Sequence, residues 1–393
     1  MKINSISVYK VPRIKENSYK YPLPFYNFTG FVFIKLELND SIYGLGEPNP
    51  YCGPINDIKN FFLKFLFPKI KNIEFQKICI NKLLKDSKKF SNNYLLNSCC
   101  VAALDQAIND IKGKLKNLPV CKLLNPNLLK KNKIYLYASG GMLFDDQEYN
   151  VLLDELSEIK NTFIGWKFRP KIPRKLNSHF KRVLSPPSFN IKDLIKFSQK
   201  ARLSVGNDFL LMIDVGSRCQ NLKEAQYLCK ALSELNFFFI EEPINPDIYK
   251  YVILKKKLNN SLMIAGGESF YKKTKILNWI NKKAIDIFQP DSNVFPISEL
   301  YKISNKLIIK DIQVIPHNWC NMVSSASNFH FANSNNNIKY IEYNIIKNFY
   351  KNIFTYKFSY KNNSFDFSLA PGLGVDLTKS KELLKNMSYE KKR

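Results

Sequence analysis

Six ionisable side chains stand at the ends of short apolar segments in the second half of this 393-residue chain. Successive members are 23 to 27 residues apart, which is about the length of one strand plus one helix. That spacing predicts that each residue closes one of six consecutive strands. Because the carboxyl ends of parallel barrel strands lie at one face, all six would ring the same opening. They are Asp214, Glu241, Glu268, Asp291, His317 and Glu342.

The first three of these residues, Asp214, Glu241 and Glu268, are carboxylates on neighbouring predicted strands. Negative charges this close together in a partly buried site repel one another, and a bound cation removes the repulsion. Oxygen ligands without Cys or His favour a hard ion, so we expect Mg²⁺, with Mn²⁺ as an alternative. Each carboxylate alone has an ordinary explanation, such as a helix cap or a salt bridge. The regular spacing of all three favours a metal site.

The segments that carry these residues belong to an alternation of apolar strands and amphipathic helices that begins near residue 133. Near-continuous apolar runs are typical of parallel strands covered on both faces, and the stretch 221–235 between two of them has a helical pattern. Eight strands favour a barrel over an open sheet, so the predicted fold class is α/β, a (β/α)₈ TIM-type barrel. The predicted strands are 133–139, 163–169, 209–214, 237–242, 262–268, 284–291, 312–317 and 338–343.

A smaller unit precedes the predicted barrel. Residues 1–130 begin with strand-like segments and continue with helical patterns, clearest over 93–115, which predicts an α+β capping domain. Residues 131–350 then form the catalytic barrel, and residues 351–393 return to the capping domain. Two long loops are expected, one at 11–30 and one as an insertion at about 170–190; loops of this length are usually functional or disordered.

The motifs around the six residues resemble the enolase superfamily, and within it the mandelate racemase subgroup. They are IDVGS, FIEEP, AGGES, FQPD, PHNW and YIEYN, and the resemblance covers nearly the whole chain. Enzymes of this superfamily use a Lys or His base together with Mg²⁺ to form an enediolate. The resemblance therefore implies an enolase-like barrel enzyme that takes the α-proton from a small carboxylate substrate.

The general base that the resemblance implies is His317. The sixth strand ends with Asp291 rather than the Lys of muconate-lactonising relatives, and Asp291 is the natural partner of His317 in a His–Asp dyad. An Asp beside a His fixes the tautomer and raises the basicity that a weak carbon acid requires. The alternative is a buried core histidine. Of the other two histidines, His179 lies in the predicted insertion.

Further positive charge is needed, because three carboxylates and a substrate carboxylate outweigh one divalent ion. Lys167 and Arg169 are separated by one residue on the second strand and match the K-x-K position of the subgroup. They could also be part of the general excess of basic residues. Glu342 resembles the subgroup's acid that hydrogen-bonds the substrate carboxylate. That role predicts a protonated Glu342 with a raised pKa.

The second K-x-K position decides between two reactions on this scaffold. Racemisation needs a base on each face of the substrate, and Arg169 is a poor base because it is almost always protonated. We therefore expect a one-base lyase, an acid-sugar dehydratase that converts a sugar acid into a 2-keto-3-deoxy acid. Lys167 leaves a racemase or epimerase open as the alternative.

The net charge of +27 suggests a third hypothesis, a catalytically inactive relative that binds nucleic acid or acidic surfaces. The lysines are scattered along the whole chain, which is typical of codon bias rather than of one binding surface. The expected partner is therefore a sugar acid, not nucleic acid or a membrane.

The eight cysteines show no C-x-x-C spacing, and the N-terminus has no apolar signal core. These features predict a cytoplasmic protein with reduced thiols. The resemblance adds the expectation of a homo-oligomer.

Overall fold

The computed structural model describes most of the chain, with gaps. Two predicted features fall largely in these gaps: most of the loop at 11–30, and residues 174–187 of the predicted insertion, which include His179. The described residues are 1–11, 31–38, 42–128, 133–173, 188–258, 262–307, 310–319, 322–345, 358–361, 364–367, 370–379 and 387–392.

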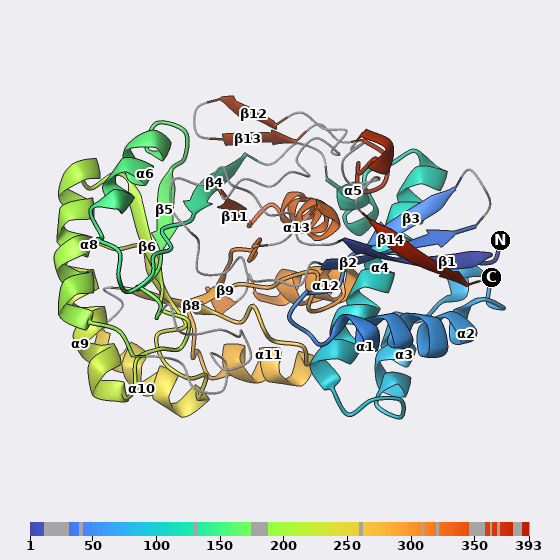
Figure 1. The fold of residues 1–393 in the computed structure, drawn as a ribbon, viewed down its shortest axis with the longest axis horizontal. Coiled ribbons are helices and arrows are strands. Elements are labelled where there is room, and N and C mark those ends of the chain that lie inside the picture. Colours follow the sequence, from blue (N-terminus) through green and yellow to red (C-terminus); the bar gives the residue numbers. More distant parts are fainter. Residues whose placement is uncertain are drawn as a thin grey trace.

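The N-terminal unit is a four-stranded antiparallel sheet covered by helices (Figure 1). Its strand order is β14 (Ser388–Lys392), β1 (Ser5–Val11), β2 (Phe31–Glu37) and β3 (Tyr43–Gly46), so the end of the chain pairs with its beginning. The α-helices are α1 (Ile55–Asn60), α2 (Phe67–Ile70), α3 (Ile80–Ser87), α4 (Tyr94–Lys116) and α5 (Val120–Leu124). A π-helical turn, η1 (Phe61–Leu66), joins α1 to α2.

Both faces of β2 are buried, and alternate residues of the strand point to opposite sides. On β2, Val32 and Ile34 pack into the core of the N-terminal unit with Phe61 of η1. Phe31 and Phe33, which alternate with them in sequence, join the larger core that continues into the barrel. The continuous apolar run of β2 therefore follows from its position between two cores.

The second unit is a curled parallel sheet of eight strands, which confirms the predicted fold class. Seven strands run in sequence order from β4 to β10, and β11 pairs with the other side of β4. The strands are β4 (Ile134–Ser139), β5 (Gly165–Phe168), β6 (Leu210–Asp214), β7 (Phe239–Glu241), β8 (Met263–Gly266), β9 (Ile287–Phe288), β10 (Gln313–Val314) and β11 (Tyr340–Asn344). An antiparallel hairpin, β12 (Phe358–Lys361) and β13 (Ser364–Phe367), is added to the start of β4.

A helix follows each of the first seven barrel strands in the described part of the chain and covers the outside of the sheet (Figure 1). Asn221 shows how one of them begins, since its side chain accepts a hydrogen bond from the backbone N–H of Glu224 at 3.0 Å. The helices are α6 (Val151–Ile159), α8 (Ile191–Val205), α9 (Leu222–Glu234), α10 (Ile248–Leu258), α11 (Lys273–Asn281), α12 (Ile297–Leu307) and α13 (Met322–Ser334). No helix in the described ranges is long and apolar enough to cross a bilayer.

The inside of the barrel consists of an apolar layer and a polar layer. The apolar layer is formed by Tyr137, Met212, Phe239, Ala265, Ile287 and Ile315. Two residues further along the chain from five of these residues stand Ser139, Asp214, Glu241, Gln289 and His317, the last two just beyond the ends of β9 and β10. The two-residue period of a strand therefore places polar side chains at the carboxyl end of the barrel, above a packed apolar floor.

Candidate active site

A buried lysine joins two carboxylates at the centre of the polar layer. Lys167 Nζ lies 2.6 Å from Oε2 of Glu241 and 2.8 Å from Oε1 of Glu342, and all three side chains are almost fully buried. Gln289 donates a further hydrogen bond to Glu241 Oε2 at 2.8 Å. Burial lowers the pKa of Lys167, but Glu241 and Glu342 outweigh it and raise the pKa well above its usual value. Lys167 is therefore held as a cation.

Arg169 holds the carboxylate at the end of β6. Its Nε donates to Asp214 Oδ2 at 2.9 Å, and its Nη2 lies 4.0 Å from Glu342 Oε1. The guanidinium also stacks on the ring of Trp319, 4.5 Å from the ring centroid. These contacts fix the direction of the guanidinium, so both residues of the predicted K-x-K pair point into the same cluster of carboxylates.

The His–Asp dyad forms between the segments that follow β9 and β10. His317 Nδ1 lies 2.6 Å from Asp291 Oδ2, and His317 Nε2 lies 3.2 Å from Glu268 Oε2 and 3.9 Å from Glu342 Oε2. Burial lowers the pKa of His317, but Glu268, Glu342 and the hydrogen bond with Asp291 outweigh it and raise the pKa to about 10. The imidazole therefore turns one nitrogen to Asp291 and the other toward the acidic side of the mouth.

Glu268 is the most exposed of the predicted ligands, with 34% of its side chain accessible. It follows Gly267, whose φ of +106° is a conformation that a residue with a side chain rarely adopts. A Cβ at Gly267 would also lie only 2.8 Å from the ring of Phe288. The second glycine of AGGES therefore lets the chain leave β8 and turn Glu268 toward His317.

The expected protonation of Glu342 is wrong. Burial would raise the pKa of Glu342, but the cations Lys167, His317 and Arg169 outweigh burial and lower the pKa far below its usual value. The backbone N–H of Asn318 also donates to Glu342 Oε2 at 2.9 Å. Glu342 is therefore an ionised acceptor that neutralises the cations, because its nearest neighbours are basic rather than acidic.

The expectation that each of the six residues closes a strand is also partly wrong. Only Asp214 and Glu241 are the last residues of their strands. Glu268, Asp291 and His317 lie two or three residues beyond theirs, and Glu342 lies inside β11. Strands β9 and β10 have only two paired residues each, so backbone segments past the sheet carry the dyad.

The donors expected for a metal ion are of the right chemical type. Glu241 Oε1 is buried without a hydrogen-bond partner, and Asp214 and Glu241 are paired residues of neighbouring strands. Burial raises the pKa of both groups, which a divalent cation would oppose. Within the described residues, however, no three His, Cys, Asp or Glu side chains are placed to bind one metal ion. Each predicted ligand instead contacts a basic side chain: Asp214 contacts Arg169, Glu241 contacts Lys167, and Glu268 contacts His317. The metal site stays a prediction.

Several residues of this cluster were missed by sequence reasoning. Gln289 immediately follows β9 and donates to Glu241, and Asn318 and Trp319 immediately follow His317 in the PHNW motif. Asn328 is a buried residue of α13 and donates to Asp291 Oδ1 at 3.0 Å. The position of Gln289, two residues before Asp291, was a usable signal, since strand parity points it inward. Asn328 carried no signal, because a helix far along the chain supplies it.

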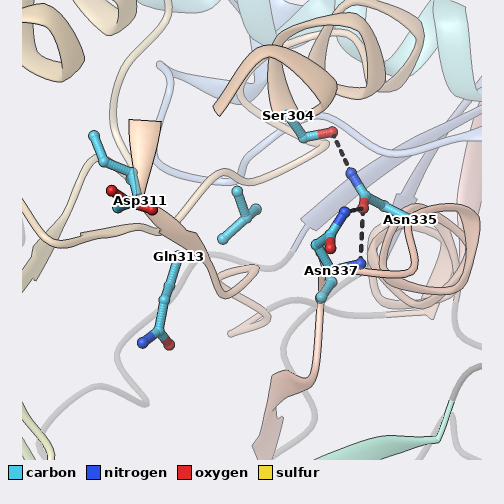
Figure 2. Close-up of a pocket in the computed structure, with 8 residues that line it drawn as sticks. Ser304, Asp311, Gln313, Asn335 and Asn337 are labelled. Carbon is cyan, nitrogen blue, oxygen red and sulfur yellow. Dashed lines mark hydrogen bonds between the residues drawn. The ribbon is translucent and has the colours of Figure 1, made fainter. Parts of the chain in front are cut away.

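A cavity of about 310 Å³ lies at the other end of the barrel. Figure 2 shows the residues that line it. Its lining includes Ser304 of α12, Gln313 at the start of β10, and Asn335 and Asn337 before β11. Asn335 donates to Ser304 Oγ at 3.1 Å. Because these residues precede the strands whose far ends carry His317 and Glu342, the cavity is separate from the candidate active site.

Comparison with known families identifies the two units. Residues 163–381 match the family described as enolase C-terminal domain-like, and residues 24–125 match the mandelate racemase / muconate lactonizing enzyme N-terminal domain. This chain belongs to the enolase superfamily. Within the superfamily it has the two-domain composition of the mandelate racemase and muconate lactonizing enzyme branch, which confirms the resemblance of its motifs.

Known relatives of this superfamily member include sugar-acid enzymes. The chain is 27% identical to an arabinonate dehydratase of Saccharolobus solfataricus over 353 residues, which are 88% of each protein. It is 24% identical to a D-galactonate dehydratase of Klebsiella pneumoniae over 367 residues, 89% of this chain and 90% of the relative. Among solved structures, the 3,6-anhydro-D-galactonate cycloisomerase from Zobellia galactanivorans matches with a TM-score of 0.79 and 25% identity, over 99% of this chain and 100% of the other.

Proposed function

We propose that this enolase-superfamily chain dehydrates a sugar acid to a 2-keto-3-deoxy acid, with His317 as the general base. The observation that carries the proposal is the contact between His317 Nδ1 and Asp291 Oδ2 at 2.6 Å. A base with its second nitrogen fixed in this way presents Nε2 to the substrate. The arabinonate and D-galactonate dehydratases among its relatives support a small hydroxy-carboxylate as the substrate.

The reaction begins with proton transfer from the carbon beside the substrate carboxylate to His317 Nε2. Asp291 stabilises the imidazolium that forms, because its carboxylate accepts the Nδ1–H hydrogen bond. The electron pair left on the substrate expels the neighbouring hydroxyl group, and the proton on His317 is available to convert that group into water. The resulting enol then becomes the 2-keto-3-deoxy acid.

Lys167 and Arg169 supply fixed positive charge during this step. The substrate carboxylate gains negative charge as its α-proton leaves, and cations placed in advance stabilise that charge without reorganisation. Both residues are buried in ion pairs and have raised pKa values, so they remain charged throughout.

Asp214, Glu241 and Glu268 would hold Mg²⁺, or Mn²⁺ in its place. A divalent ion bound there would add positive charge beside the substrate carboxylate. The oxygen-only donor set and the unpartnered Glu241 Oε1 support this assignment.

A racemase or epimerase is less consistent with these contacts. A second base on the opposite face of the substrate would have to be Lys167 or Arg169. Lys167 lies in two buried ion pairs, at 2.6 and 2.8 Å, and a neutral amine there would deprive Glu241 and Glu342 of their nearest counter-charge. This energetic argument favours a single base and therefore elimination over inversion.

The proposal is tested by incubating the full chain and Mg²⁺ with a panel of aldonic acids that includes arabinonate and D-galactonate. A colorimetric assay for 2-keto-3-deoxy acids should detect product from at least one acid. His317→Asn should lower kcat by about 10³-fold or more, in the range that loss of a general base produces, with an unchanged circular dichroism spectrum. Epimerised acid without keto product would instead identify an epimerase.

A further inference from the structure

We propose that Asn328 of α13 is a positioning residue that holds the His317–Asp291 dyad in its working geometry. This inference rests on the proposed role of the dyad as the catalytic base. The Asn328 side chain contacts both members of the dyad and is fully buried.

The amide of Asn328 connects the two segments that carry the dyad. Its Nδ2 donates to Asp291 Oδ1 at 3.0 Å and to the backbone carbonyl of His317 at 3.0 Å. Its Oδ1 accepts a hydrogen bond from the backbone N–H of Ser292 at 2.9 Å. Acceptors surround the nitrogen and a donor faces the oxygen, so the orientation of the amide is fixed by its neighbours. Only an amide of this length provides both functions at these points.

These contacts control the direction of the Asp291 carboxylate. Oδ2 of Asp291 faces His317 Nδ1, while Oδ1 accepts from Asn328 Nδ2 and from the backbone N–H of Asn293 at 3.0 Å. Rotation of the carboxylate would break bonds at both oxygens. Asp291 can therefore orient His317 because Asn328 orients Asp291.

The need for such a residue follows from the short strands beneath the dyad. The paired residues end at Phe288 on β9 and at Val314 on β10, three residues before Asp291 and His317. Beyond the strands, the backbone N–H of His317 donates to the carbonyl of Pro290 at 3.1 Å. The hydrogen bonds of Asn328 add side-chain connections between two segments that the sheet no longer holds in register.

The N-terminal unit fixes the helix that carries Asn328. Glu47 follows β3, and its Oε2 accepts hydrogen bonds from the backbone N–H groups of Val323 and Ser324 at 3.0 and 3.2 Å, in the first turn of α13. On the other side, Gln106 of α4 donates to the backbone carbonyl of Ser292 at 2.8 Å. The N-terminal unit therefore holds both α13 and the segment to which Asn328 is bonded.

The test compares Asn328→Ala with Asn333→Ala, a matched control on the same helix. Asn333 is also buried, and its Nδ2 donates to the backbone carbonyl of Phe329 at 2.9 Å without contacting the dyad. With the acid that turns over, Asn328→Ala should lower kcat by about 10- to 100-fold, as small misplacements of a catalytic group do, with little change in KM. Asn333→Ala should keep the parent kcat even if its melting temperature falls as much.

A second measurement does not depend on turnover. The chain has three histidines, so the imidazole spectrum of ¹⁵N-histidine-labelled protein is simple, and His317→Asn assigns the His317 signals. Asn328→Ala should shift or broaden the Nδ1–H signal of His317, whereas Asn333→Ala should leave it in place. Asn328→Asp keeps the shape of the side chain but replaces the donor by an oxygen. It should change kcat and the Nδ1–H signal in the same direction as Asn328→Ala, and it tests the inference if Asn328→Ala does not fold.

The outcomes separate this inference from the proposed function. If no acid is dehydrated but the Nδ1–H signal moves in the Asn328 variants alone, the positioning role stands and the reaction is wrong. If the signal and kcat of the Asn328 variants match those of Asn333→Ala, Asn328 is an ordinary buried amide and the inference is overturned.

Discussion

Lys167 and Glu241 form an ion pair that is closed to solvent, with Nζ 2.6 Å from Oε2 and at most 1% of either side chain exposed. The same ammonium group lies 2.8 Å from Glu342 Oε1. Two carboxylates thus share their nearest cation, in a place where water cannot replace it. Stability and charge balance in the barrel are linked through this one side chain.

Removal of the Lys167 charge should therefore destabilise the fold. Lys167→Met keeps much of the side-chain volume but removes the nearest cation of both Glu241 and Glu342, and breaking a buried pair in this way costs about 3–5 kcal/mol. Lys77→Met is the control, because Lys77 pairs with Glu74 at the surface and both side chains are well exposed. Urea unfolding should show a large loss in the free energy of unfolding for Lys167→Met and almost none for Lys77→Met. Equal losses would contradict the assigned importance of the buried pair.

The pKa of His317 should fall when Mg²⁺ is added. Glu268 and Glu342 help to raise this pKa to about 10, so the imidazole is protonated at neutral pH and cannot accept a proton. A divalent ion bound by Glu268 would offset the negative charge beside Nε2 and favour the neutral imidazole. Titration of the ¹⁵N-labelled imidazole with and without saturating Mg²⁺ measures the change. An unchanged pKa in the presence of Mg²⁺ would contradict the assignment of Glu268 as a ligand.

His330 should make the fold sensitive to acid. It is fully buried in α13, its Nδ1 accepts a hydrogen bond from the backbone N–H of Cys121 at 3.3 Å, and burial lowers its pKa from 6.5 to about 3. The unfolded chain takes up this proton below about pH 6.5 and the folded chain only near pH 3. The contribution of neutral His330 to the free energy of unfolding is therefore fully present above pH 6.5. It is lost as the pH drops from 6.5 toward 3, by a few kcal/mol in total.

The matched variant for this effect is His330→Gln, which retains a donor and an acceptor but does not titrate. Chemical denaturation between pH 4.5 and 7.5 should show a steeper loss of stability with acid for the parent than for His330→Gln. Parallel curves for the two proteins would show that other groups cause the acid sensitivity.

The fold was accessible from the sequence because two patterns agreed. The spacing of 23 to 27 residues between polar residues indicated barrel units, and apolar strand segments alternated with amphipathic helical segments along the same stretch. Both signals are local and repeat along the chain. They survive even where β9 and β10 are reduced to two paired residues.

The features of the site that the sequence did not predict depend on contacts between distant segments. The nearest cation to Glu342 is Lys167, 175 positions earlier in the chain, whereas the predicted ring of carboxylates suggested acidic rather than basic neighbours. Asn328 contacts Asp291 across 37 positions because α13 folds back over the loop after β9. Neither contact leaves a periodic trace in the sequence, since each depends on the packing of one side chain.

The role of His317 is tested most directly by following the α-proton of an acid that turns over, by ¹H NMR in D₂O with Mg²⁺ present. The parent chain should remove the proton from C2 and give a 2-keto-3-deoxy product with one deuterium at C3. Folded His317→Asn should leave the C2 proton in place. Product formation by His317→Asn at the parent rate, or a product that carries the original C2 proton, would contradict the assignment of His317 as the base.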